Sequence, residues 1–233
     1  MKVIILCGGL GSRLSEETRI KPKPMVKIGN KPILSHIIKI YENYDFKEFF
    51  LALGYKGYVI KKYFSKKKSH SKFNLINTGA TTLTGGRLLR LKKYFKKNEN
   101  FMLTYGDGLT GQNLKNLVKF HLKNNKIATM TVVRPPVRYG EVKMNSNLIR
   151  SFKEKPQSSS GWINGGFFVF NSKIFEFIKN DHTMLEREPL ERLAKKGQLV
   201  GYKHYGFWQC MDTLREKNLL KKIYNSKKAP WVK

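Results

Sequence analysis

The 233-residue sequence lacks the features that mark disulfide-stapled, zinc-binding and membrane-spanning proteins. It has only two cysteines, Cys7 and Cys210, and neither belongs to a CxxC motif or a cysteine and histidine cluster. No segment approaches the roughly 18 to 20 consecutive apolar residues that cross a bilayer. The apolar start after Lys2 is too short for a signal-peptide core. These absences predict a cytoplasmic protein without membrane insertion.

Acidic residues are also scarce, with 16 Asp and Glu against 46 Lys and Arg, so the formal net charge is +30. Such a charge raises the affinity for any polyanion, and nucleic acid is therefore one candidate partner. Only 10 of the basic residues are arginines, the type favoured for base readout, and the lysines are spread along the chain. The sequence carries no recognised nucleic-acid module. We expect solvated surface charge and no specific nucleic-acid partner.

Apolar runs alternate with amphipathic segments, an order typical of a doubly wound α/β fold in which helices flank a mostly parallel, mixed sheet. The length fits one domain. Predicted strands cover Val3–Cys7 and residues 48–53, 73–77, 101–105 and 127–133, and a strand-richer second half adds 139–144, 148–152 and 167–170. Predicted helices cover 32–44, 57–64 and 114–122, and the segment 84–95 is predicted to contain another helix.

The first strand runs into a glycine-rich turn that carries an arginine. Its residues are Leu6, Cys7, Gly8, Gly9, Gly11, Ser12 and Arg13, and Lys23 follows. A turn without side-chain bulk lets backbone N–H groups surround phosphate oxygens, and the two cations add charge for the same anion. The pattern matches neither the GxGxxG dinucleotide motif nor a P-loop. A nucleoside triphosphate site is predicted, and the alternative is a tight strand-to-helix turn.

Gly106 and Asp107 follow a predicted strand directly, and ligands of open α/β sheets bind beyond such strand ends. Asp107 lies between glycines, where aspartate is also a common turn residue. Asp212 precedes a helical segment and can alternatively be a helix N-cap. The residues alone leave both alternatives open.

Several blocks in order along the chain resemble the sugar-1-phosphate nucleotidylyltransferases, with a close match to the cytidylyltransferases among them. The blocks are 6–13, 21–25, 54–60, 84–88, 105–108, 154–156, 163–169, 206–209, 211–215 and 228–231. The resemblance implies the Rossmann-like fold of nucleotide-diphospho-sugar transferases. It places a nucleotide-binding part at about 1–125 and a small, strand-rich sugar-phosphate part at about 126–233 of one domain.

The resemblance implies transfer of a nucleotidyl group from CTP to glucose 1-phosphate, giving CDP-glucose and pyrophosphate for deoxysugar and surface-polysaccharide synthesis. It assigns residues 6–13, Thr82, Arg87 and Gly106 to the nucleotide, with Arg13 on the triphosphate and Lys23 at the phosphates that react. Asp107 and Asp212 would hold Mg²⁺. Glu154, Lys155, Asn164 and Gly165 would bind the sugar phosphate, and Trp162 and Trp208 would line its pocket or pack in the core. A homo-oligomer is also implied.

Two departures from the cytidylyltransferase pattern affect the choice of base. The lysine-rich segment between Phe64 and Asn77 is shorter than in those enzymes, and Ala80 stands where they often have an acidic residue. A thymidylyl- or uridylyltransferase therefore remains an alternative. A non-catalytic sugar-nucleotide sensor is a second alternative, disfavoured because Arg13, Lys23, Asp107, Lys155 and Asp212 are all present.

Overall fold

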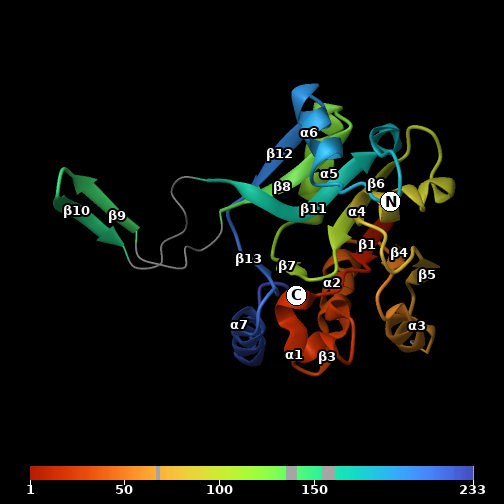
Figure 1. Ribbon diagram of the computed structural model, residues 1–233, viewed down its shortest axis with the longest axis horizontal. Helices are drawn as coiled ribbons and strands as arrows, with labels where there is room; N and C mark the ends of the chain where they lie inside the picture. The colour runs from red at the N-terminus through yellow and green to blue at the C-terminus, as the bar shows by residue number, and fades with distance from the viewer. Residues whose placement is uncertain (67–68, 135–140, 154–160, 233) are drawn as a thin grey trace.

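A seven-stranded mixed sheet organises the protein, in the order β12-β8-β11-β6-β1-β4-β5 (Figure 1). The computed structural model describes residues 1–66, 69–134, 141–153 and 161–232. The sheet strands are β1 Val3–Cys7, β4 Glu48–Leu53, β5 Lys72–Asn77, β6 Asn100–Tyr105, β8 Ala128–Val133, β11 Ile163–Asn171 and β12 Leu199–His204. All neighbours pair in parallel except β11, which is antiparallel to both β6 and β8. The predicted mostly parallel, mixed α/β sheet is confirmed.

Three small sheets and the helices complete the described structure. The small sheets pair β2 Lys27–Ile28 with β3 Lys31–Pro32, β7 Gly108–Thr110 with β13 Trp208–Cys210, and β9 Glu141–Asn145 with β10 Leu148–Lys153. The α-helices are α1 Ser15–Thr18, α2 Ile33–Glu42, α3 Gly57–Ser65, α4 Thr84–Leu89, α5 Leu114–Asn124, α6 Glu188–Lys195 and α7 Leu214–Asn225. Short 3₁₀ helices are η1 Ser12–Leu14, η2 Lys23–Met25, η3 Lys92–Tyr94 and η4 Ser172–Phe177.

The sheet separates two hydrophobic cores, because successive side chains of a strand point to opposite faces. In β11, Phe167 packs with α2, α5 and α7 on one face, and Phe168 packs with α4, α6 and η4 on the other. Both rings are fully buried, and truncating either to alanine would cost about 3–5 kcal/mol. Central strands buried on both faces explain why the sequence shows continuous apolar runs there rather than alternation.

The start of β11 departs from regular pairing and positions part of the lining of the candidate site. Asn164 pairs with Val132 and Phe168 with Met130, so β11 has two more residues than β8 over this stretch. Gly166 lies within the bulge at φ +76°, and a Cβ there would come within 2.7 Å of the Tyr105 ring. Glycine is therefore required, and the bulge brings residues 164–166 against the end of β6.

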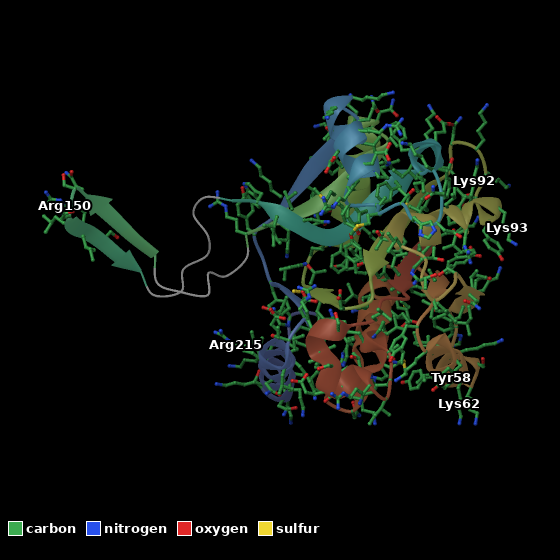
Figure 2. All side chains as sticks on the ribbon, in the orientation of Figure 1. Tyr58, Lys62, Lys92, Lys93, Arg150 and Arg215 are labelled. Carbon is green, nitrogen blue, oxygen red and sulfur yellow. The ribbon has the colours of Figure 1, made fainter. Side chains whose placement is uncertain are left out.

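Basic side chains are spread over the surface. Figure 2 shows Lys62, Lys92, Lys93 and Arg215 pointing outward from different elements, and all four are exposed. Within the described residues, no helix is both long and apolar enough to span a bilayer.

Candidate active site

A cavity of about 640 Å³ opens where β1 and β6 end and β11 begins. It lies beyond the carboxyl ends of the parallel strands, where ligands bind in open α/β sheets. The sequence-predicted residues that line it are Leu6, Cys7, Gly8, Gly9, Gly11, Ser12, Arg13, Lys23, Thr82, Arg87, Gly106, Asp107, Asn164, Gly165 and Asp212. Glu154 and Lys155 lie outside the described residues.

The glycine turn after β1 forms one wall of the cavity. Gly11 has φ +67° and begins η1, and a Cβ there would lie 2.8 Å from the Thr18 methyl group. A Cβ on Gly8 would lie 2.1 Å from the Arg87 guanidinium carbon. Because the glycines have no side chains, the turn packs closely against Arg87 and Thr18 while its backbone still lines the cavity.

Arg87, in the last turn of α4, packs behind this turn. Its guanidinium donates to the carbonyl oxygens of Gly8 (3.0 Å), Leu53 (3.2 Å), Gly79 (2.7 Å) and Ala80 (3.3 Å), and to the Thr78 hydroxyl (2.8 Å). Only 4% of Arg87 is exposed. Because both terminal nitrogens bond to the protein, this geometry favours a role in holding the glycine turn over the nucleotide contact that the resemblance implied.

Lys23, Asp107 and Asp212 meet in the cavity beside the glycine turn, where a Cβ on Gly11 would lie 3.1 Å from Lys23 Cβ. The Lys23 ammonium lies 2.6 Å from Asp107 Oδ2 and also contacts Asp212 Oδ1. Arg13 Nη1 lies 2.9 Å from the other oxygen of Asp212. Burial lowers the pKa of Lys23, but the two carboxylates outweigh burial and raise it above its usual value. Lys23 is therefore a fixed cation, while the Arg13 side chain is 73% exposed and reaches the site from solvent.

A short ladder brings the two distant aspartates together. β7 and β13 pair antiparallel with Gly108 opposite Cys210, and Met211 N donates to Asp107 O at 2.9 Å. Thr213 rather than Asp212 caps α7, because its side chain accepts from Glu216 N while Glu216 accepts from Thr213 N. The N-cap alternative for Asp212 is therefore wrong, and its carboxylate is free to enter the cavity.

The donor set fits a small divalent cation. A positive group already lies between the two carboxylates, and carboxylate oxygens are the ligands that Mg²⁺ prefers. Cys210 lies near Asp212, but burial and the neighbouring acids raise the pKa of its thiol to about 12. Glu216 is engaged by the backbone N–H groups of Asp212 and Thr213. Asp107 and Asp212 are thus the residues suited to hold a metal ion.

The far end of the cavity holds polar groups that sequence reasoning missed. Glu186 accepts hydrogen bonds from Tyr105 Oη (2.5 Å) and Thr84 Oγ1 (2.6 Å), and all three line the cavity. Trp208 Nε1 donates to Gly165 O at 2.7 Å, which agrees with the expected pocket position of this indole. Glu186 belongs to no motif, so only the fold reveals it. Trp162 packs instead against Tyr205 and Arg134.

Cys7, like Cys210, takes a structural position. Cys7 is 1% exposed, and burial strongly raises the pKa of its thiol, so this side chain stays a neutral, apolar filler at the end of β1.

Comparison with known proteins connects this geometry to a family. Residues 2–209 match the family model described as nucleotidyl transferase. The glucose-1-phosphate cytidylyltransferase of Salmonella typhimurium is 46% identical over 253 aligned positions, which cover 99% of this chain and 98% of that protein. Because the alignment is longer than the 233 residues of this chain, the Salmonella protein has segments that this chain lacks.

Solved structures share the fold over nearly the whole chain. HddC from Yersinia pseudotuberculosis, complexed with GMP-PN, has a TM-score of 0.75 at 25% identity, covering 96% of this chain and 99% of its own. UDP-glucose pyrophosphorylase, complexed with UDP-glucose, has a TM-score of 0.75 at 17% identity, covering 97% and 98%. The fold, the cavity at the strand ends and the family match agree, and the chain belongs to the nucleotidyl transferase family.

Proposed function

We propose that this protein transfers CMP from CTP to glucose 1-phosphate, forming CDP-glucose and pyrophosphate. The observation that carries the proposal is 46% identity, over 99% of the chain, to an enzyme named for that reaction. Substrates in this family are a nucleoside triphosphate and a sugar 1-phosphate. The cavity supports the proposal because it combines a glycine turn, two cations and two carboxylates.

The proposed reaction needs positioning more than proton transfer. An ionised phosphate oxygen of the sugar forms a bond to the α-phosphorus of CTP. The bond from that phosphorus to the bridging oxygen breaks, and pyrophosphate leaves with the electron pair. Because the attacking oxygen is already ionised near neutral pH, no general base is required. Catalysis then depends on bringing two anions together and neutralising the charge that builds up.

The proposed roles divide this work among residues of the cavity and of the segment 154–156. In this proposal the backbone of the glycine turn and Arg13 hold the triphosphate, and Thr82, which lines the cavity, contacts the base. Lys23 leaves the two carboxylates to contact the phosphate that reacts. Arg87 keeps the turn in shape by binding the Gly8 carbonyl oxygen. Asn164 and Gly165 contact the hexose, together with Glu154 and Lys155 for its hydroxyls and phosphate.

Nucleotidyltransferases of this family generally use a divalent metal. We infer that the metal here is Mg²⁺ and that Asp107 and Asp212 hold it. When bound, the metal ion would neutralise phosphate charge and so reduce the repulsion between the two anionic substrates.

The proposal is tested by incubating the protein with CTP, UTP, dTTP, ATP or GTP against several hexose 1-phosphates in Mg²⁺ buffer and identifying the products by mass. CDP-glucose should be the main product. A clear preference for UTP or dTTP would reject the choice of CTP, and the absence of any sugar nucleotide would favour a sensor.

Three variants sharpen this test. Asp107→Asn and Asp212→Asn should each lose pyrophosphate release while keeping a cooperative unfolding transition. Asp45→Asn removes an exposed carboxylate on another element and should keep full activity. Normal turnover in both site variants would refute the metal assignment.

A further inference from the structure

Glu186 lies in the cavity but takes no part in the machinery described above. It precedes α6, on the sheet face opposite to α7, whereas Lys23, Asp107 and Asp212 gather on the α7 side. Within the part of the chain that the structure describes, no ion pair includes Glu186. A charged group without a counter-ion that lines a ligand cavity calls for a functional explanation.

Two hydroxyl groups fix the orientation of this carboxylate. Tyr105 Oη donates to Oε1 at 2.5 Å and Thr84 Oγ1 donates to Oε2 at 2.6 Å. Thr84 is itself held, because its hydroxyl accepts from Leu185 N at 2.9 Å. The side chain of Asn164 hydrogen-bonds to the Tyr105 hydroxyl. Three elements, β6, α4 and β11, thus preorganise a single acceptor group.

The carboxylate retains capacity for a ligand. Two carboxylate oxygens offer about four acceptor positions, and the two hydroxyls use two of them. Glu186 is only half-buried and borders the cavity, so its other acceptor positions are accessible to a bound molecule. An acceptor with a full negative charge selects hydrogen-bond donors and repels phosphate.

Among the proposed substrates, sugar hydroxyls are the donors that fit. The phosphates are drawn to Arg13 and Lys23 on the α7 side of the cavity, which leaves the uncharged part of the substrate near Glu186. Resting on the function proposed above, we propose that Glu186, oriented by Tyr105 and Thr84, accepts a hydrogen bond from one sugar hydroxyl of the bound substrates and sets selectivity for it. The link to Asn164 favours the hexose, and the ribose of the nucleotide is the other source of the same chemistry.

The test pairs protein variants with substrates that lack one hydroxyl. We would measure kcat/KM of wild type and Glu186→Gln for glucose 1-phosphate, for its 2-, 3-, 4- and 6-deoxy analogues, and for dCTP in place of CTP. Glu186→Gln should lower kcat/KM for the complete substrates about 10- to 100-fold, the value of a charge-assisted hydrogen bond. With the wild-type protein, one deoxy substrate should have a kcat/KM lower by the same factor than the complete substrate. For that deoxy substrate, Glu186→Gln should cause almost no further loss of kcat/KM.

The identity of that substrate assigns the source. Coupling to one deoxyhexose identifies a hexose hydroxyl, and coupling to dCTP identifies the ribose. An equal loss for every substrate, or no loss at all, would overturn the proposal. Tyr105→Phe should weaken selection for the same hydroxyl by a smaller factor, because it removes one of two orienting donors while keeping the ring. Glu188→Gln is the matched control and should change nothing, because this half-buried carboxylate at the start of α6 pairs with Lys179 and Arg192.

Calorimetry separates this inference from the proposed function. Binding of glucose 1-phosphate and its deoxy analogues, measured without turnover, should show the same coupling with Glu186→Gln. A wild-type protein that binds none of the sugar phosphates contradicts both the proposed function and this inference. Wild-type and Glu186→Gln proteins that bind them equally well contradict only the role of Glu186.

Discussion

Replacing Lys23 with methionine should strengthen metal binding by the substrate-free protein while it impairs catalysis. The Lys23 ammonium contacts both Asp107 and Asp212, so a divalent ion has to displace it before both carboxylates can bind. Methionine keeps most of the side-chain volume and removes the competing charge.

The magnitude follows from these contacts. Each charge-assisted hydrogen bond contributes about 1.5–3 kcal/mol, and the Lys23 side chain is only 12% exposed, so solvent weakens these bonds little. The displaced ammonium recovers part of this energy by forming hydrogen bonds with water. The net free energy needed to displace Lys23 is therefore about that of one charge-assisted hydrogen bond. At about 1.4 kcal/mol for each factor of ten, Lys23→Met should bind the metal about 10- to 100-fold more tightly.

The assay is titration with Mn²⁺, followed by the electron paramagnetic resonance signal of the free ion, without nucleotide. Wild type, Lys23→Met and Lys21→Met are compared, since Lys21 pairs with Glu17 and not with the two aspartates. Only Lys23→Met should bind more tightly, and its kcat should fall about 100-fold or more as a phosphate-neutralising group is lost. Unchanged or weaker Mn²⁺ binding by Lys23→Met would refute the reasoning.

Three further predictions concern stability. Burial lowers the pKa of His121 from 6.5 to about 4. The stability that the neutral imidazole contributes is therefore complete above pH 6.5 and is lost as the pH falls through 4. In urea titrations, His121→Asn should reduce the acid-induced loss of unfolding free energy by up to about 3 kcal/mol. Hydrogen bonds from Lys217 and Lys21 lower the pKa of Glu17 below 4.5. The free-energy difference between wild type and Glu17→Gln, about 1–2 kcal/mol at pH 7, should therefore decline as the pH falls below 4.5 and vanish once the carboxylate is protonated in the folded protein. Arg87→Met should lower the unfolding free energy by about 3 kcal/mol or more in denaturant titrations, and calorimetry should show weaker CTP binding. Arg87→Lys should restore neither property, because one ammonium group cannot donate to all five acceptors of the guanidinium.

The long elements could be predicted because their signals are local. β4 has the bounds expected from its apolar run. The spacing of isoleucines after a proline predicted a helix over 32–44, and α2 occupies Ile33–Glu42 within that range. The segment 84–95 contains the expected helix, α4, which ends at Leu89 and is followed by the short η3 rather than by more α-helix. The cause is tertiary, since Phe95 turns to extended backbone and packs on Phe101 with ring centroids 4.5 Å apart.

Elements with weak local signals were missed. β7 and β13 have three residues each, and their pairing joins segments about a hundred residues apart, which no sequence window contains. The edge strand β12 and the helix α6 were also missed, although Pro189 in the first turn of α6 and the spacing of Leu190 and Leu193 were available signals.

The candidate site divides in the same way. The glycine turn was visible because strand and glycines are adjacent, whereas joining Asp107 to Asp212 depended on the family resemblance. Glu186 could not be found from sequence, because its significance comes from Tyr105 and Thr84, which lie about eighty and a hundred residues away.

The bulge near the start of β11 lets this strand pair regularly with β6 while its pairing with β8 is interrupted. Phe167–Asn171 keep their register with β6, while the stretch from Asn164 to Phe168 no longer follows β8 residue for residue. The surplus is two residues, an even number, so side chains beyond it keep facing their own cores. Changes of residue type within this stretch can therefore reshape the cavity, and with it the proposed contacts to the sugar, while the aromatic packing beyond it stays intact.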